Sequence, residues 1–197
     1  MQFLQVEVHT FAELGDVAAL KLVSSEEPQK LNQLDELGRT TLHRAALKGQ
    51  RLAIEMLLAA GVDVNKVDND GWTALNSAAA NGQNDAVSAL VKGSPDVNTA
   101  DKCGYTPLRW ATYWAAATNI TTTIETLLAA KADPNIPDDQ GVTALSRAAD
   151  KGHTNSVSIL LEGKADPRKP DNEAWCPLNA AVMYISRWIH NLLLFTL

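Results

Sequence analysis

Apolar residues along this chain recur with the spacing of short amphipathic helices, and polar, turn-forming residues separate these segments. In four segments the apolar positions fall at i, i+3 and i+4, which line one face of a helix with 3.6 residues per turn. The four triplets are Ile54, Leu57 and Leu58; Val87, Leu90 and Val91; Ile124, Leu127 and Leu128; and Val157, Leu160 and Leu161. Because such a face needs a neighbour to bury it, the pattern predicts helices that pack side by side.

The same short phrase stands ahead of each of these helices. It reads Gly, any residue, Thr, a small residue or Pro, and Leu, and it begins at Gly38, Gly71, Gly104 and Gly141. A fifth copy at Ala174 has lost both the Gly and the Thr. An Asp stands three residues before every copy, and most copies follow one another at about 33 residues. A fixed period of this length is the signature of a solenoid, in which one unit stacks on copies of itself.

The phrase predicts a first, shorter helix in every unit. Its Thr has a hydroxyl suited to capping a helix N-terminus, and the Pro or small residue that follows suits the first helical position. The helix is expected to end near Gly49, Gly82 or Gly152, where a glycine can take the left-handed turn. Stretches such as 61–65 and 132–135 are rich in turn formers. Each unit should therefore be two helices followed by an extended hairpin.

These motifs resemble ankyrin repeats, which carry Thr-Pro-Leu-His, Ala-Ala, Gly, Leu-Leu and Gly-Ala-Asp-x-Asn in the same order. The resemblance covers nearly the whole chain and implies an all-α solenoid, an ankyrin-repeat stack of helix-turn-helix units joined by β-hairpin-like loops. We expect a single domain over residues 1–197. Its parts are a degenerate N-terminal capping unit at 1–37, repeats at 38–70, 71–103, 104–140 and 141–173, and an incomplete C-terminal repeat at 174–197.

The third repeat is longer than the others, and its excess residues fall within 115–123, where the inter-helix Gly is missing. A longer first helix and a larger loop are expected there. Insertions in solenoids map to surface loops, so this one is either a binding edge or an insertion without a function.

Composition fits a soluble globular protein, because 46% of the residues are hydrophobic and 20% are charged. The net charge of −6 and the lack of a basic stripe argue against nucleic acid as the main ligand. Cys103 and Cys176 stand two repeats apart, which is too far for a disulfide. With no export signal and no transmembrane segment in view, we expect an intracellular protein, cytoplasmic or organellar.

The sequence carries no pattern that indicates catalysis or cofactor binding. Its four histidines match no metal-ligand spacing, and it has no phosphate-binding glycine loop, nucleophile elbow or paired carboxylates. The resemblance implies instead that His43 and His153 are structural and bond the loop backbone. The regular aspartates likewise favour turns, since Asp bonds its own backbone in such loops. We therefore predict that the protein is not an enzyme and holds no cofactor or metal ion.

The resemblance implies that a protein partner docks on the concave face, which is lined by residues beside each phrase's Gly and before the inter-helix Gly. Aromatic residues gather at these positions, and aromatic anchors beside polar groups are typical of interface hot spots. The predicted partner-binding residues are Arg39, Asn69, Asp70, Trp72, Lys102, Tyr105, Tyr113, Trp114, Trp175 and Tyr184. For Trp72, Tyr105 and Trp114, packing against neighbouring groups is the alternative to binding. Trp110 is expected to pack against the next repeat.

The C-terminal end is predicted to form a second interface. Residues 185–197 continue the fifth repeat but lack the polar outer face that a terminal cap needs. The apolar residues concerned are Trp188, Ile189, Leu192, Leu193, Phe195 and Leu197. A partner subunit, a membrane surface or further repeats beyond the chain could cover them, whereas crossing a bilayer takes about 20 residues.

Two functions are favoured over an enzyme or the targeting part of one. The first is a non-catalytic protein–protein interaction module, an adaptor or scaffold that binds one partner through its concave face. The alternative is an accessory structural subunit, held permanently through its apolar C-terminal end in a larger assembly, which could be membrane-associated. Because one repeat fold serves many partners, the sequence does not identify the partner.

Overall fold

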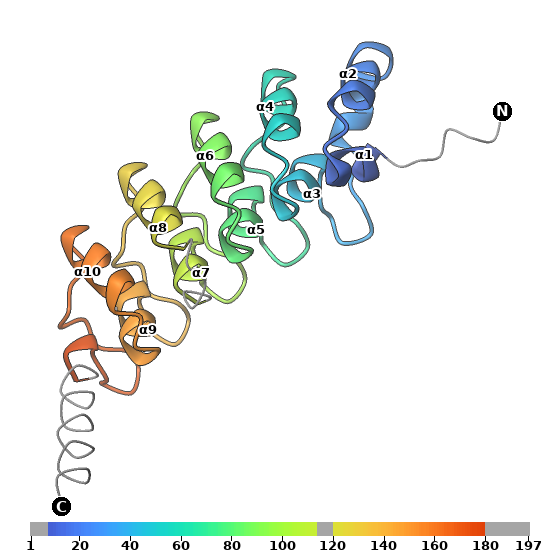
Figure 1. Ribbon diagram of the computed structural model, residues 1–197. Helices are drawn as coiled ribbons and strands as arrows, with labels where there is room; N and C mark the ends of the chain where they lie inside the picture. Colours follow the sequence, from blue (N-terminus) through green and yellow to red (C-terminus); the bar gives the residue numbers. More distant parts are fainter. Residues whose placement is uncertain (1–7, 114–119, 180–197) are drawn as a thin grey trace, which may run out of the picture.

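The computed structural model describes residues 8–113 and 120–179, and these residues form an elongated stack of helix pairs (Figure 1). In each of the last four pairs, the first helix is shorter than the second over the described residues. The pairs are α1 (Val8–Leu14) with α2 (Val17–Glu26), α3 (Thr41–Leu47) with α4 (Arg51–Ala59), α5 (Ala74–Ala80) with α6 (Asn84–Lys92), α7 (Pro107–Tyr113) with α8 (Ile120–Ala129), and α9 (Ala144–Asp150) with α10 (Thr154–Glu162). A short 3₁₀ helix, Pro28–Asn32, follows the first pair.

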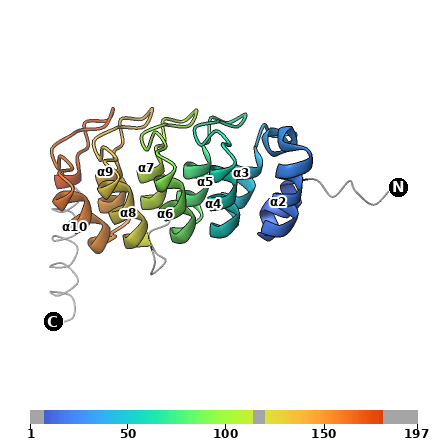
Figure 2. The same cartoon turned by 90° about the horizontal axis from the view of Figure 1, so that it is seen from above.

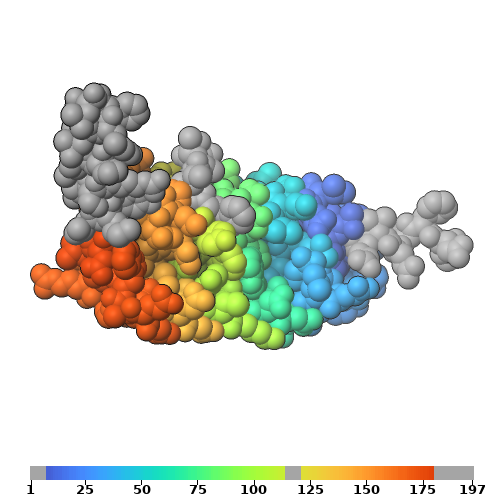
Figure 3. Space-filling model, turned by 90° about the horizontal axis from the view of Figure 1, so that it is seen from below, coloured from blue at the N-terminus to red at the C-terminus, as the bar shows by residue number. Residues whose placement is uncertain are grey.

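The stack has two rows of helices and one row of loops. The first helices contact one another in the order α1, α3, α5, α7 and α9, and the second helices do so in the order α2, α4, α6, α8 and α10. The loops project from the row of first helices on one side (Figure 2). In the space-filling view the repeats follow one another as transverse bands from the N-terminal to the C-terminal end (Figure 3). The predicted all-α solenoid is therefore confirmed.

The helix boundaries confirm the capping chemistry that the phrase predicts. The hydroxyl oxygens of Thr40, Thr73 and Thr143 accept a hydrogen bond from the backbone N–H three residues later, at the N-cap position. Inter-helix turns at Gly49 and Gly82 have φ angles of 74° and 65°, in the left-handed region that favours glycine. Local sequence thus sets where the first helices begin and end.

The core runs without a break along the stack and consists of alanine and branched aliphatic residues. In the second helices, the first two residues of each predicted triplet are fully buried in α4, α6 and α8, and the third is half-buried. Burying each such side chain contributes about 1.5–3 kcal/mol. The last pair departs from this, because Leu160 is buried but Leu161 is 44% exposed. That exposure marks the end of the stack as the described residues define it.

Loop aspartates hold each hairpin in shape. In every loop, Oδ1 of the Asp accepts hydrogen bonds from the backbone N–H groups two and four residues later. No β-strand is formed within 8–113 or 120–179, and these hairpin-shaped loops are closed by the Asp side chains together with one backbone bond from each Asp N–H to the carbonyl oxygen four residues later. The structural role predicted for the Asp series is confirmed.

Neighbouring loops are joined to one another at two levels. Near the tips, a backbone N–H of each loop donates to a carbonyl oxygen of the preceding one, as in Asn69 to Leu37 and Lys102 to Asp70. At the base, an Asn side chain of one loop accepts from a backbone N–H of the next, as in Asn65 with Asp96. The loops therefore form one continuous, hydrogen-bonded surface.

Several sequence predictions fall outside the described residues. The longer first helix and larger loop of the third repeat concern residues 114–119, and the incomplete fifth repeat concerns 180–197. The exact repeat boundaries stay predictions as well. The predicted partner-binding residues that lie within the described ranges are on the loops and first helices.

Candidate partner-binding surface

Four aromatic rings meet at the centre of the side formed by loops and first helices. Trp110, on α7, lies in the middle, with ring centroids 4.6 Å from Trp72, 5.0 Å from Tyr105 and 6.0 Å from Tyr113. These spacings and tilted or edge-on arrangements are the ones that aromatic pairs prefer. We call these four residues the aromatic cluster.

A hydrogen bond fixes the central ring. Nε1 of Trp110 donates to Oδ2 of Asp101 at 2.8 Å, while Oδ1 of the same carboxylate holds the loop backbone. Packing is thus confirmed for Trp110. Trp110 was expected to pack against the next repeat, but the rings that it contacts belong to its own repeat and the preceding one. The reason is the hydrogen bond to Asp101, which turns the indole towards the loops.

The aromatic cluster is packed and accessible at the same time. Trp72, Tyr105 and Trp110 are half-buried, and Tyr113 is 39% exposed. The sequence left binding and packing open for Trp72 and Tyr105. In the structure both pack on Trp110 and keep part of their surface in contact with solvent.

Two arginines support the rings from α7 and α9. The guanidinium of Arg109 lies 4.6 Å from the centroid of Tyr105, and that of Arg147 lies 5.9 Å from the centroid of Tyr113. Arg109 is only 1% exposed and pairs with Asp138 at 3.0 Å. Sequence reasoning missed this pair, although Arg109 stands at the phrase position that holds His43 and Asn76, and an arginine there was a signal.

His43 and Asn76 position the loops that carry the rings. Nδ1 of His43 accepts from the N–H of Thr40, so Nε2 carries the proton and donates to the carbonyl oxygen of Trp72 at 2.8 Å. Burial lowers the pKa of His43 and so favours the neutral ring, which the acceptor role of Nδ1 requires. Asn76 donates to the carbonyl oxygen of Tyr105 at 3.1 Å. The structural role predicted for His43 is confirmed.

The other predicted histidine differs. His153 is the N-cap residue of α10 and makes no side-chain capping bond. At the matching position in earlier repeats, Gln50 and Gln83 donate to backbone carbonyls of the preceding repeat. The bond to loop backbone that was predicted for His153 is not seen among the described residues. His9, by contrast, contacts the carbonyl oxygens of Gln33 and Arg39.

Predicted polar binding residues divide into internal and exposed ones. Arg39 is half-buried and donates to Oδ2 of Asp35 at 3.0 Å, so its guanidinium belongs to the loop. Burial opposes ionisation of Asp35, but hydrogen bonds from Arg39, Arg44 and the backbone prevail and lower its pKa to about 2. Asn69 is exposed, and its side chain donates to the carbonyl oxygen of Glu36 in the preceding loop. Asp70 and Lys102 are exposed at the loop tips.

The remaining predicted residues lie at or beyond the C-terminal limit of the description. Trp175 is 36% exposed and stands apart from the aromatic cluster, in the last described loop. The others lie outside the described residues: Trp114, Tyr184, Trp188, Ile189, Leu192, Leu193, Phe195 and Leu197. The structure therefore brings together Trp72, Tyr105 and Tyr113 and leaves the C-terminal interface untested.

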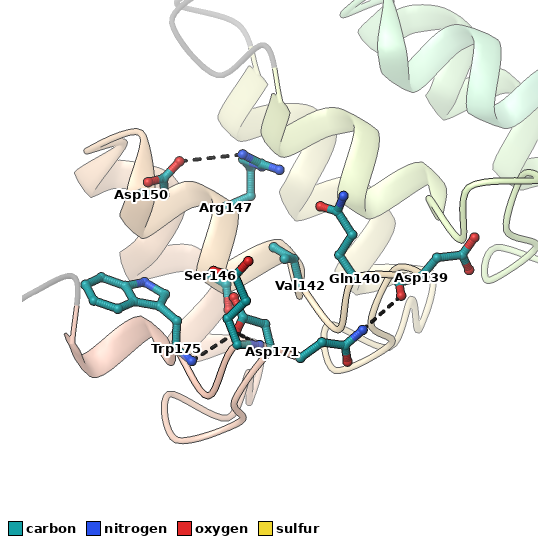
Figure 4. A pocket seen from close by; sticks show the side chains of 10 residues that line it. Asp139, Gln140, Val142, Ser146, Arg147, Asp150, Asp171 and Trp175 are labelled. Atoms are coloured by element: carbon teal, nitrogen blue, oxygen red, sulfur yellow. Dashed lines mark hydrogen bonds and ion pairs between the residues drawn. The ribbon is translucent and has the colours of Figure 1, made fainter.

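A hollow of about 570 Å³ opens beside Trp175, between the last two described loops and α9 (Figure 4). We call it the acidic hollow. It is lined by Asp139, Gln140, Val142, Ser146, Arg147, Asp150, Asp171, Asn172, Glu173 and Trp175. A hollow of this size is within the range of ligand sites in proteins.

The described residues show no sign of metal chemistry or of a membrane span. Within them, no group of three or more His, Cys, Asp or Glu residues could hold a metal ion. Within the same ranges, no helix combines the length and hydropathy that crossing a bilayer requires. Cys103 and Cys176 are both free thiols.

Comparison with known families identifies the chain as a set of ankyrin repeats. Ankyrin repeats (3 copies) match residues 53–120 and 112–196, and Ankyrin repeats (many copies) match residues 22–78. The chain belongs to the ankyrin repeat family. Proteins of this family generally mediate protein–protein interactions and are typically non-catalytic. The comparison with curated proteins finds no match.

Proposed function

We propose that this protein is a non-catalytic interaction module that binds a protein partner through its concave face, the side formed by the loops and first helices. The observation that supports this proposal is the aromatic cluster, whose rings stay partly exposed although Trp110 is hydrogen-bonded and Tyr105 is stacked on Arg109. Asp70 and Lys102 supply exposed polar groups at the tips beside it.

Rigid aromatic residues are suited to this task for an energetic reason. Immobilising a mobile side chain on binding costs about 0.5–1.5 kcal/mol, and rings already held by neighbours avoid most of that cost. Trp and Tyr are also enriched among the few residues that dominate binding energy. The aromatic cluster therefore forms the expected centre of the interface, and the polar tips form its rim.

An affinity capture tests the proposal. Partners captured from native extract by the wild-type chain are identified by mass spectrometry, and the main one is purified for calorimetry. Trp72→Ala combined with Tyr105→Ala should weaken its affinity at least tenfold. Leu22→Ala with Leu52→Ala is the matched control, because both leucines are exposed on second helices, away from the loops.

Circular dichroism and a melting curve must show that the aromatic variant keeps its helices, since both rings pack on Trp110. Trp72→Phe with Tyr105→Phe, which keeps aromatic packing, should retain most of the affinity. Unchanged affinity in the alanine variant would overturn the concave-face proposal.

One observation favours the second candidate function, an accessory subunit held through its C-terminal end. An apolar hollow of about 510 Å³ lies at the end of the stack, where Leu161 and Leu178 are 44% and 52% exposed. If a permanent partner covers this face, the isolated chain should self-associate, and Leu161→Glu should return it to a monomer in light scattering. A wild-type chain that is monomeric at high concentration would count against this candidate.

An intracellular location also remains a proposal, with which the two free thiols agree.

A further inference from the structure

The acidic hollow holds more negative charge than its own cation balances. Asp139, Asp150, Asp171 and Glu173 line it together with one cation, Arg147. Arg147 pairs with Asp150 at 3.5 Å, and Figure 4 shows both on one side of the hollow, away from Asp171 and Trp175. Among the described residues, no ion pair reaches the other three carboxylates.

Three of the four other loop aspartates use their second carboxylate oxygen, Oδ2, to bind a side-chain donor. The donor is a guanidinium at Asp35 and at Asp138, and an indole N–H at Asp101. Oδ1 of each of these residues is already engaged by the backbone of its own loop. Oδ2 is therefore the oxygen through which such a loop can hold a cation.

Asp171 has the same loop geometry without the donor. Its Oδ1 accepts from the backbone N–H groups of Glu173 and Trp175 at 2.9 Å. In the other repeats the donor comes from the positions of Arg39, of Arg109, and of Arg44 or Trp110. The corresponding residues here are Trp175, Ser146, whose hydroxyl contacts Thr143, and Ala180, which lies outside the described residues. No side-chain donor to Oδ2 of Asp171 is seen in the described part of the chain. Asp68 also lacks one in the described part of the chain, and its Oδ1 accepts from the backbone N–H of Trp72, whose ring packs on Trp110.

Trp175 adds an aromatic face to the same hollow. Its side chain lines the hollow next to Asp171, to which its own backbone is hydrogen-bonded, and the residue is 36% exposed. A cation over the face of a tryptophan is attracted by the ring, most strongly when it is also partly desolvated. A carboxylate and an indole that face one hollow suit a guanidinium, which can pair with the first and stack on the second.

We propose that the acidic hollow binds an arginine side chain of a basic segment in the protein partner. The partner's guanidinium takes the place that Arg39 and Arg44 occupy beside Asp35, pairing with Asp171 while it stacks on Trp175. This inference rests on the proposed function, because it names the chemistry of one partner contact on the same face. It also predicts that the partner's contacting segment is positively charged, since this chain carries a net charge of −6.

A peptide of defined chemistry tests the inference on the full chain. The probe is a fluorescein-labelled nonapeptide with three arginines among glycine and serine, and binding is followed by fluorescence anisotropy at low ionic strength. Asp171→Asn with Glu173→Gln should weaken binding at least tenfold, while the asparagine keeps the Oδ1 acceptor that the loop needs. Glu26→Gln with Glu125→Gln removes the same charge from exposed second-helix sites and should change affinity less than twofold.

Two further measurements separate a guanidinium site from general charge attraction. Trp175→Ala, which leaves the charge unchanged, should weaken binding about fivefold, and a lysine version of the peptide should bind more weakly than the arginine version. Equal loss in both glutamine-containing variants, or equal affinity for the two peptides, would overturn the arginine site. Lack of binding to the wild-type chain would do the same.

The failure of this inference can be told apart from failure of the proposed function. If the natural partner is lost with Trp72→Ala and Tyr105→Ala but binds Asp171→Asn with Glu173→Gln unchanged, the concave face stands and the arginine site falls. If the arginine peptide binds and responds as expected while the aromatic variant keeps the partner, the arginine site stands and the role of the aromatic cluster falls.

Discussion

Two junctions in this stack join neighbouring repeats through the same phrase position with different chemistry. Between α5 and α7, Asn76 donates a neutral amide N–H to the carbonyl oxygen of Tyr105 at 3.1 Å. Between α7 and α9, Arg109 donates Nη2 to the carboxylate of Asp138 at 3.0 Å. Both bridging side chains are buried, so each must satisfy its polar groups within the protein.

The difference shows what a charged bridge costs. Among the described residues, Nε and Nη1 of Arg109 are buried with no hydrogen-bond partner, and so is Nε of the neighbouring Arg147. Burial, together with the nearby charge of Arg147, lowers the pKa of Arg109. In return, the guanidinium stacks on Tyr105 and supports the aromatic cluster. We infer that this junction is less stable than a neutral one would be, and that it holds one ring of the aromatic cluster in place.

The largest effect is expected from breaking the charged bridge. Asp138→Asn keeps the Oδ1 acceptor for the loop but leaves Arg109 buried without a counter-charge, which costs about 3–5 kcal/mol. Urea denaturation followed by circular dichroism measures the loss. Asp68→Asn is the matched control, because Asp68 holds its loop in the same way and forms no ion pair among the described residues. Equal losses in the two variants would show that the ion pair is not the cause.

A second substitution should reverse most of that loss. Arg109→His, added to Asp138→Asn, removes the uncompensated charge and restores the neutral residue type that His43 represents at this position. We expect recovery of about 2–4 kcal/mol relative to Asp138→Asn alone, because replacing both members of a buried pair is far cheaper than removing one. The double variant is compared with both single variants in one cycle. A double variant no more stable than Asp138→Asn would contradict the account given for this junction.

The smallest effect is expected on the pH dependence of stability, through the bond from His43 to the carbonyl oxygen of Trp72. Because burial lowers the folded-state pKa of His43 below 6.5, the unfolded chain binds more protons in acid. The stability from neutral His43 is complete above pH 6.5 and is lost as pH falls from there through the folded pKa. His43→Asn, which copies Asn76, should therefore flatten the decrease in melting temperature between pH 7 and pH 5. Burial and Lys151 also lower the pKa of His153, and that contribution remains in both proteins. Parallel curves would contradict the assignment to His43.

The sequence predicted the fold well because the repeat encodes it locally. A threonine cap, an inter-helix glycine and an apolar triplet each act within a few residues, and four copies of the phrase predict the same local structure. The loop aspartates were assigned to turns for the same reason, since their bonds span only two to four residues. Burial of a helix face depends on a neighbour rather than on the helix itself, so the 44% exposure of Leu161, in the last described helix pair, did not follow from the periodicity.

The candidate site was predicted only in part. Trp72, Tyr105 and Tyr113 were expected on the concave face, and the structure places them around one ring. That ring, Trp110, was predicted to pack against the next repeat and was not among the predicted partner-binding residues. The acidic hollow was not foreseen, because its lining comes from two loops and a helix whose spacing no local pattern gives.

The sequence by itself determined the repeat, the helix ends, the buried aliphatic positions and the loop turns, because those depend on short-range hydrogen bonds and periodicity. Tertiary structure decided which side chains meet across repeats: that Trp110 joins Trp72 to Tyr113, that Arg109 is buried against Asp138, and that Asp171 and Trp175 face one hollow. The longest of these direct contacts, between Trp72 and Trp110, joins residues 38 positions apart. They exist only because stacking brings equivalent positions of successive repeats side by side.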